Sequence, residues 1–206
     1  MADKKFILGI TGGSGVGKTT LINNLYQSFG EKITTLSLDN YYKPIEYQQL
    51  DENGVVNFDL PDALDTTQLK HDFEALINGQ AITQKKYQFN NPDCEEQTTI
   101  ISPKKIILVE GLFVMHYPFL SKKLDFSVYI NVDPDLQLKR RLKRDVEERN
   151  INKEEVLYQW ENHVIPAYEN FILPHQHKVD MILNNNTQFD QKSMTDLLHV
   201  IETNLA

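Results

Sequence analysis

Apolar residues along this chain of 206 residues follow two patterns that alternate along its length. Short continuous apolar runs predict strands buried on both faces of a sheet, and they occupy residues 6–10, 33–38, 106–109, 126–132 and 179–183. Apolar residues at helical spacing predict helices, at residues 20–29, 65–79, 134–150, 153–171 and 190 onward. Pro166 should kink or break its helix. The alternation predicts an α/β protein, with a mostly parallel sheet and helices on both faces.

Two segments depart from this alternation. Residues 43–64 show no periodicity, and a loop of this length inside a compact domain is usually functional or disordered. Its aromatic residues, Tyr47 and Phe58, favour an ordered functional loop. Residues 81–101 predict two strands around the turn at residues 90–93, a small β-hairpin inserted into the domain.

The strongest chemical signal lies directly after the first predicted strand. Residues 12–19 match the pattern G-x-x-x-x-G-K-[ST] of a phosphate-binding loop, and the strand before and the helix after supply the required context. Glycines allow successive backbone N–H groups to turn toward an anion, and the helix start adds unsatisfied N–H groups. Lys18 supplies charge for the β- and γ-phosphates, and the Thr19 hydroxyl suits Mg²⁺.

The loop therefore predicts binding of a nucleoside triphosphate, ATP or GTP, together with Mg²⁺. A glycine-rich turn that binds nothing is the alternative, and the flanking strand and helix argue against it. The predicted nucleotide-binding residues are Gly12, Gly13, Ser14, Gly15, Val16, Gly17, Lys18, Thr19 and Thr20.

Carboxylates follow two further predicted strands. Asp39 comes directly after the strand at 33–38, and Glu110 after the strand at 106–109. Ligands bind at the carboxyl ends of parallel strands, so both should lie on one rim with Lys18 and Thr19. One carboxylate near a triphosphate can serve the metal and the other the proton of a nucleophile. The alternatives are a turn or helix cap for Asp39 and a solvated strand end for Glu110.

Four arginines lie on the predicted helix at 134–150, namely Arg140, Arg141, Arg144 and Arg149. A charged run on a helix is usually a solvated face, and Glu147 and Glu148 fit that interpretation. Arginine also stabilises the charge of a transferring phosphoryl group, and a movable helix can carry it over a site as a lid. The spacing alone leaves both interpretations open.

Composition and charge narrow the class of protein. The net charge of −8 argues against nucleic acid or an anionic membrane as a partner. The single cysteine, Cys94, excludes an internal disulfide and is typical of a reducing compartment. No signal peptide or membrane span is apparent, so we expect a cytoplasmic protein with one domain over residues 1–206. Whether it forms homo-oligomers is left open.

Several motifs together resemble the uridine kinase (uridine–cytidine kinase) family of P-loop kinases, over roughly residues 5–183. The matching stretches are Thr11–Thr20, Leu38–Tyr42, Asn57–Asp65, Val109–Gly111, Arg140–Asp145, and Pro174 with Val179–Asp180. Several independent motifs in one order are more specific than a phosphate-binding loop alone. The resemblance implies a P-loop kinase core with a β-hairpin over the nucleoside site and a helical lid.

The resemblance also implies roles for individual residues. Asp39 is expected to be the general base on the nucleoside 5′-hydroxyl, and Glu110 to lie near the metal. Lys18, Arg141 and Arg144 complete the implied catalytic set. The implied substrate-binding residues are Asp59 on the ribose hydroxyls with Tyr42 and Phe58 beside it, Tyr87 and Phe89 facing the base, and Arg141, Arg149 and Gln159 on the lid side. Thr19, Glu110 and Asp39 are the implied metal-side residues.

The chain departs from this family where the base is recognised. The family usually has a histidine and then an arginine on the hairpin, where this chain has Pro92 and Cys94. It has an arginine where this chain has Ile151, and a glycine- and arginine-containing run where this chain has Asn184–Asn186. The residues implied in phosphoryl transfer are all present.

The implied activity is ATP- and Mg²⁺-dependent phosphorylation of the 5′-hydroxyl of a ribonucleoside, uridine or cytidine first, as in pyrimidine salvage. One alternative is a kinase of the same architecture that acts on another hydroxylated small molecule, such as a different nucleoside, a vitamin or a sugar phosphate. Another is a nucleotide-binding regulatory module without transfer activity. Joint retention of Asp39, Glu110 and the arginines argues against a module, because binding alone would need only the phosphate-binding loop.

Overall fold

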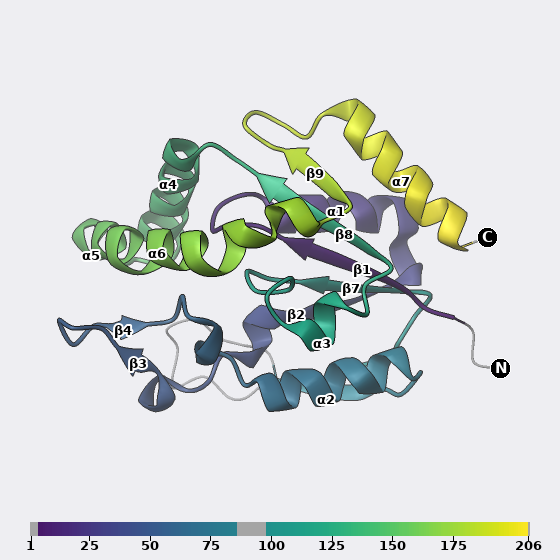
Figure 1. The fold of residues 1–206 in the computed structure, drawn as a ribbon, viewed down its shortest axis with the longest axis horizontal. Coiled ribbons are helices and arrows are strands. Elements are labelled where there is room, and N and C mark those ends of the chain that lie inside the picture. The colour runs from purple at the N-terminus through teal and green to yellow at the C-terminus, as the bar shows by residue number, and fades with distance from the viewer. Residues whose placement is uncertain (1–3, 86–97, 206) are drawn as a thin grey trace.

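A computed structural model describes residues 4–85 and 98–205 of the chain, and its centre is a five-stranded parallel sheet (Figure 1). The strand order is β2-β7-β1-β8-β9. The strands are β1 (Phe6–Thr11), β2 (Ile33–Ser37), β7 (Ile106–Glu110), β8 (Phe126–Asn131) and β9 (Met181–Asn184). The predicted α/β architecture with a mostly parallel sheet is confirmed, and each apolar run forms one of its strands.

Helices cover both faces of this sheet (Figure 1). The helices are α1 (Lys18–Phe29), α2 (Thr66–Ile77), α3 (Pro118–Ser121), α4 (Pro134–Leu142), α5 (Lys153–Gln159), α6 (Ile165–Ala167) and α7 (Gln191–Leu205). Apolar residues of α1 and α7 share one buried cluster, and those of α2 and α3 share the other. The four-residue helix α3 was not predicted from the sequence, because it is too short to show a period.

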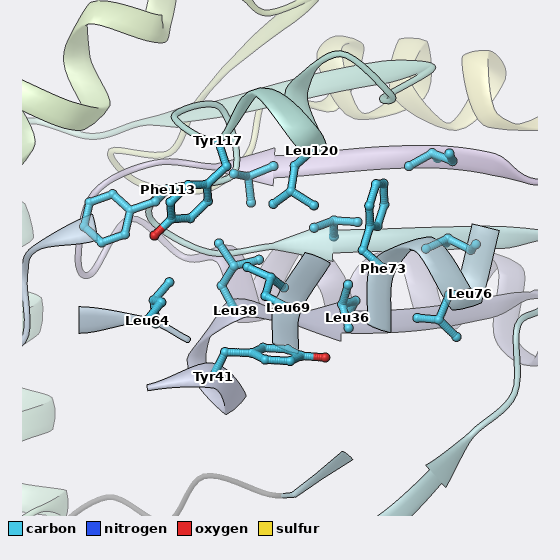
Figure 2. Packing of buried hydrophobic residues seen from close by; sticks show 14 of the residues in the cluster. Leu36, Leu38, Tyr41, Leu64, Leu69, Phe73, Leu76, Phe113, Tyr117 and Leu120 are labelled. Atoms are coloured by element: carbon cyan, nitrogen blue, oxygen red, sulfur yellow. The ribbon is translucent and has the colours of Figure 1, made fainter. Parts of the chain in front are cut away.

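The central strands are apolar throughout because their side chains alternate between these two clusters. Leu8 and Ile10 of β1 pack with α1 and α7, whereas Ile7 packs with α2. Figure 2 shows the cluster that contains α2, in which Phe73 packs near the strands of the sheet and Tyr41 lies at the bottom of the view. A strand buried on both faces needs this pattern, and it holds β1 in the middle of the sheet.

The segment at 43–64 is ordered and contains short regular elements that the sequence did not predict. Strands β3 (Gln49–Leu50) and β4 (Val56–Asn57) pair as an antiparallel hairpin, and 3₁₀ turns form at Ile45–Tyr47 and Pro61–Ala63. Strands of two residues are too short to show an alternating pattern, so the sequence predicted an ordered loop but not these elements. The hairpin lies beside α5 and α6 (Figure 1).

The predicted hairpin at 81–101 is present at its base. Strands β5 (Ile82–Lys85) and β6 (Thr98–Ile101) pair antiparallel, with Ile82 opposite Ile101 and Lys85 opposite Thr98. The residues between these strands lie outside the described part of the chain, and they include Tyr87, Phe89, Pro92 and Cys94.

The helices after β8 contain wider turns than predicted. Helix α4 continues as a π-helical segment, Lys143–Glu148, and α5 continues through π-helical segments Trp160–Val164 and Tyr168–Ile172 on either side of α6. Pro166 does not break the helix, because it lies between two π-helical segments whose wider turns accommodate a residue without an N–H. No helix in residues 4–85 or 98–205 is long and apolar enough to cross a bilayer.

Two leucines test where the stability of the fold resides. Leu69 of α2 is completely buried, whereas Leu50 of the β3–β4 hairpin is 63% exposed. We expect Leu69→Ala to lower the free energy of unfolding by about 2–5 kcal/mol, because it leaves a cavity in the core. Leu50→Ala should change it by less than about 0.5 kcal/mol. Urea unfolding monitored by circular dichroism measures both, and equal losses would contradict this assignment of the core.

Candidate active site

The phosphate-binding loop joins β1 to α1 through glycines with positive φ. Gly15 has φ 73° and Gly17 has φ 98°, angles that other residues rarely adopt. A Cβ on Gly17 would lie 2.5 Å from Nδ2 of Asn185, and the Asn185 side chain donates a hydrogen bond of 2.8 Å to the Val16 carbonyl. Among the described residues no side chain caps α1, so its first N–H groups are available to an anion.

Lys18 is the first residue of α1 and folds back over this loop. Its ammonium donates to the carbonyls of Gly12 at 3.2 Å and Gly13 at 3.1 Å. Burial lowers the pKa of Lys18, and the negative charges of Glu110 and Asp39 oppose that shift. The predicted loop cation therefore lies close to both predicted carboxylates, on the rim formed by the ends of β1, β2 and β7.

Glu110 and Asp39 are brought together by the pairing of β2 with β7. Ser37, the last residue of β2, lies opposite Glu110, and its hydroxyl donates a hydrogen bond to Oε1 of Glu110. Burial raises the pKa of Glu110, and the charge of Asp39 adds to that rise. Asp39 follows as the exposed residue of a 3₁₀ turn, and its N–H donates to the Ser37 Oγ at 3.3 Å. The capping role considered for Asp39 therefore belongs to Ser37.

These oxygens form a donor set of the kind that Mg²⁺ prefers. Thr19 is exposed beside Lys18, and Glu110 is half-buried at the neighbouring strand end. Over residues 4–85 and 98–205, no three His, Cys, Asp or Glu side chains gather into a metal site of their own. A hydroxyl with one or two carboxylates fits a cation held largely by phosphate oxygens and water.

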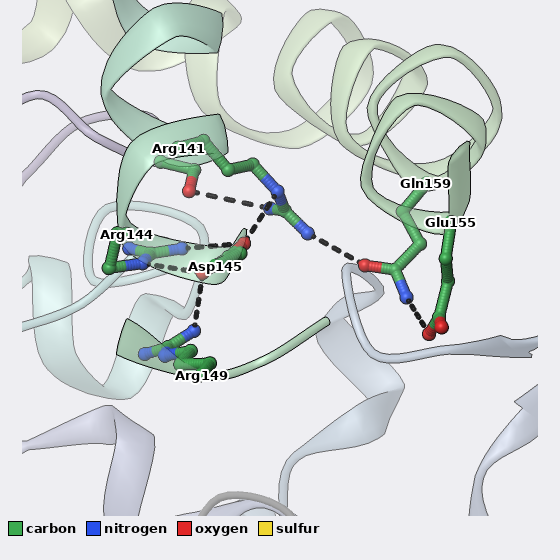
Figure 3. Close-up of polar contacts among 7 residues, drawn as sticks. Arg141, Arg144, Asp145, Arg149, Glu155 and Gln159 are labelled. Atoms are coloured by element: carbon green, nitrogen blue, oxygen red, sulfur yellow. Dashed lines mark hydrogen bonds and ion pairs between the residues drawn. The ribbon is translucent and has the colours of Figure 1, made fainter. Parts of the chain in front are cut away.

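A buried carboxylate, Asp145, gathers three of the arginines (Figure 3). Asp145 is 1% exposed, and it pairs with Nε of Arg141 at 3.2 Å, with Nε of Arg144 at 2.7 Å and with Nη1 of Arg149 at 3.0 Å. No role for Asp145 was predicted from the sequence. Its spacing of four residues from both Arg141 and Arg149 is the signal that could have indicated it.

Arg141 also joins the phosphate-binding loop to the lid side of the site. Its Nη1 donates to the Ser14 hydroxyl at 3.4 Å, and its Nη2 donates to Oε1 of Gln159 at 3.0 Å (Figure 3). Gln159 in turn donates to Glu155 at 3.1 Å. Three residues assigned to one site by the sequence, Ser14, Arg141 and Gln159, therefore lie in direct contact.

Arg140 lies apart from this cluster, although it is adjacent in sequence. Its guanidinium donates to the Asn185 carbonyl at 2.9 Å, and its Nη1 is buried with no hydrogen-bond partner among the described residues. Arg140 lines a cavity of about 470 Å³ beside the start of α1. The other lining residues include Gly17, Thr20, Asn185 and Phe189. The cavity and the role of Asn185 were not predicted from the sequence.

A second cavity, of about 250 Å³, lies on the opposite side of the loop. Asp59 lines it together with Ser14, Trp160 and Tyr168. Burial raises the pKa of Asp59, while the positive charges of Arg141 and other neighbours oppose the rise. Tyr42 packs edge-on against Phe58, with ring centroids 6.0 Å apart. The two base-facing aromatic residues expected from the resemblance, Tyr87 and Phe89, lie outside the described residues.

The chain is similar to known proteins in sequence and in fold. The family model described as "Phosphoribulokinase / Uridine kinase family" matches residues 7–191. A uridine kinase of Clostridium perfringens (strain SM101 / Type A) is 35% identical over 181 residues, which are 87% of each chain. A possible uridine kinase from Bacillus stearothermophilus has a similar structure, with a TM-score of 0.61 and 18% identity over 88% of this chain and 90% of that one. Phosphoribulokinase from Rhodobacter spheroides also has a similar structure, with a TM-score of 0.63 and 14% identity over 89% of this chain and 71% of that one.

Replacing Asp145 tests whether the arginine cluster depends on this carboxylate. We expect Asp145→Asn to lower the free energy of unfolding by about 3 kcal/mol, because Arg141, only 8% exposed, loses its counterion. Glu147→Gln on the same helical segment removes an exposed charge and should cost less than about 0.5 kcal/mol. Chemical denaturation measures both variants, and equal stabilities for the two would show that the cluster does not need Asp145.

Proposed function

The chain belongs to the phosphoribulokinase/uridine kinase family, and we propose that it transfers the γ-phosphoryl group of ATP to the 5′-hydroxyl of a ribonucleoside, uridine or cytidine first. The activity would require Mg²⁺ and would serve pyrimidine salvage. The observation that carries the proposal is the convergence of Lys18, Asp39 and Glu110 beside the phosphate-binding loop, facing the arginines held by Asp145. Binding of a nucleotide alone would need the loop but not this convergence.

The donor is assigned to the loop and to the cavity of about 470 Å³ next to it. The N–H groups at the start of α1 would bind the phosphates, and Phe189 and Arg140 line the space for the base. The unpartnered Nη1 of Arg140 is a donor that a nucleotide could use. This placement supports a nucleoside triphosphate over a smaller phosphate ester, which would leave the cavity unfilled.

The acceptor is assigned to the other side of the loop, where Asp59 lines the cavity of about 250 Å³. A carboxylate accepts two hydrogen bonds in parallel, and this geometry suits the 2′- and 3′-hydroxyls of a ribose. Tyr42 and Phe58 supply apolar contact beside it, and Gln159 and Arg149 complete the polar surface on the lid side. The charge of Asp39 acts on both Lys18 and Arg149, which supports its place between donor and acceptor.

In the proposed reaction, Asp39 accepts the proton of the 5′-hydroxyl while that oxygen attacks the γ-phosphorus. The bond from the γ-phosphorus to the bridging oxygen breaks, and ADP leaves with the electron pair. Lys18, Arg141 and Arg144 stabilise the charge on the transferring group. Thr19 and Glu110, with Asp39 nearby, would hold Mg²⁺, which neutralises phosphate charge when bound.

A screen of ADP formation tests the proposal. The purified protein, ATP or GTP and Mg²⁺ are incubated with a panel of nucleosides, vitamins and sugar phosphates. We expect release of ADP from ATP, or of GDP from GTP, that depends on a ribonucleoside, with the phosphate found on its 5′-oxygen. Turnover of another hydroxylated compound alone would assign a different acceptor to the same site. Nucleotide binding without turnover of any acceptor would make the protein a regulatory module.

Lys18 and Asp39 are assigned different tasks, and their variants should separate. We expect Lys18→Ala to weaken ATP binding and abolish turnover together, because the phosphates lose their main countercharge. Asp39→Asn should leave the Kd for ATP nearly unchanged and lower kcat by roughly 10²–10⁴, the usual contribution of a positioned general base. Calorimetric ATP titration and steady-state kinetics measure the two effects. A similar loss of ATP affinity in both variants would make Asp39 a metal ligand first.

The departures at Pro92 and Cys94 lead to an expectation about specificity. Proline has no N–H and cysteine is a weak donor, so neither replaces a histidine or arginine on the base edge. We expect kcat/KM for uridine and cytidine to differ by less than about tenfold, or 1.4 kcal/mol. The 2′-deoxy forms should react far more slowly, because Asp59 requires the diol. Strong selection of one pyrimidine would show that other residues, Asn90 and Asn91 first, read the base.

A further inference from the structure

The β3–β4 hairpin is joined to α5 and to the π-helical segment that follows it by a polar cluster that the proposed reaction does not use. Oδ2 of Asp51, at the end of β3, accepts hydrogen bonds of 2.7 Å from the Tyr158 hydroxyl and 2.7 Å from Nε2 of His163. Asn53 Nδ2 donates to the same Tyr158 oxygen at 2.7 Å. We call Asp51, Asn53, Tyr158 and His163 the clasp.

The clasp is built into the structure rather than laid over its surface. The His163 side chain is 1% exposed and that of Asp51 is 13% exposed. Hydrogen bonds, from Tyr158 first, hold the pKa of Asp51 well below its usual range, so the group is a carboxylate at neutral pH. A buried imidazole that meets a carboxylate 112 residues away in sequence fixes two separate segments against one another.

Asp51 uses its two oxygens for two different purposes. Oδ1 accepts the N–H groups of Asn53 at 2.9 Å and Val55 at 2.8 Å, which shapes the turn of the hairpin. Oδ2 faces Tyr158 and His163. At the base of the hairpin, Gln48 donates to the carbonyls of Lys43 and Ala63. The hairpin is therefore held at both ends.

This hairpin leads directly into Asp59. Asp59 lies two residues after the end of β4, and its N–H donates to Oδ1 of Asn57, the last residue of β4, at 2.9 Å. The clasp partners on the other side, Tyr158 and His163, flank Gln159 and Trp160 in sequence, and Trp160 lines the same cavity as Asp59. Docking of the hairpin thus sets the distance between the two walls of the acceptor cavity.

We propose that Asp51, Tyr158 and His163 are positioning residues, which hold Asp59 against the helix carrying Gln159 and so set the affinity for the acceptor. None of the three needs to touch the substrate. The inference rests on the proposed function only in naming Asp59 as the ribose-binding group. It predicts a selective effect on the acceptor, because the phosphate-binding loop and Lys18 belong to other elements.

The kinetic test uses uridine and ATP as the two varied substrates. We expect Tyr158→Phe and His163→Phe each to raise the KM for uridine about tenfold, the value of one hydrogen bond to a charged group. The KM for ATP and kcat should stay within about twofold of the wild type. His163→Gln retains a donor at the Nε2 position and should restore most of the uridine affinity. Tyr26→Phe, which removes an exposed hydroxyl bonded to Thr35 at 3.0 Å, is the matched control and should change nothing.

A second measurement does not depend on the substrate. Amide hydrogen exchange, followed by mass spectrometry, should become about tenfold faster over residues 49–59 in Tyr158→Phe and remain unchanged over α1. This variant is at a half-buried position, so it tests the clasp even if His163→Phe fails to fold. If wild type turns over no nucleoside, the proposed function fails, and exchange over residues 49–59 still decides the clasp.

Three outcomes would overturn the inference. Unchanged exchange over residues 49–59 would show that the clasp does not hold the hairpin. An unchanged KM for uridine, together with a lower melting temperature, would show that the clasp stabilises the fold without affecting the affinity for the acceptor. Equal increases in the KM values for uridine and ATP would indicate a general distortion of the protein.

Discussion

The parallel pairing of β7 with both β1 and β2 is the constraint on which the candidate site depends. Ile10 and Ser37 both lie opposite Glu110, so the three strands end at the same level. The chain leaves β1 into the phosphate-binding loop and leaves β2 into the turn that carries Asp39. A shift of one residue in either register would turn Glu110 toward the opposite face of the sheet and separate it from Lys18. Core packing on both faces of β7 prevents such a shift, because Ile107 and Leu108 belong to different apolar clusters.

Charge in this protein is arranged locally, against its overall balance. The chain carries a net charge of −8, yet the described arginines of the lid side gather at one place. They do so because the Asp145 carboxylate is buried among them, where ion pairs with three guanidinium groups replace its contacts with water. Arg141 keeps donors for Ser14 and Gln159 in addition to its pairing with Asp145. The cluster is therefore both fixed in position and still cationic, which is what a developing phosphoryl charge requires.

The sequence predicted the elements that have a long, uniform pattern, and it missed those set by distant partners. The buried strands and α1, α2 and α7 follow from apolar periodicity, and the loop at residues 12–19 follows from its own motif. The strands β3 and β4 and the helix α3 each span only about one period of their pattern, so the pattern does not repeat within them. The roles of Asp51 and His163 depend on the hydrogen bond between them, and no local sequence pattern links residues so far apart. The wide turns around Pro166 depend on packing rather than on propensity, so the proline alone suggested a break.

The site residues divide in the same way. Lys18 and Thr19 sit inside a motif that defines their chemistry, and Asp39 and Glu110 could be grouped because strand ends of a parallel sheet share an edge. The run at 140–149 gave no indication that Arg140 and Arg141 contact different parts of the protein. Helical geometry separates adjacent side chains by about 100°, so neighbours in sequence serve the loop after β9 and the lid side respectively. Asn185, which supports Val16, belongs to a segment whose sequence suggested only a departure from the family.

The uncapped start of α1 makes the stability of the folded chain depend on its surroundings. A helix start without a side-chain cap lacks a contribution of about 1 kcal/mol that a serine or aspartate would give. An anion that occupies this position supplies the missing hydrogen bonds and binds only the folded state. At a concentration a hundredfold above its Kd, such a ligand adds about 2.7 kcal/mol to the free energy of unfolding. Removal of such a ligand would then leave more of the chain unfolded and open to proteolysis, so that the lifetime of the protein would follow the supply of the ligand.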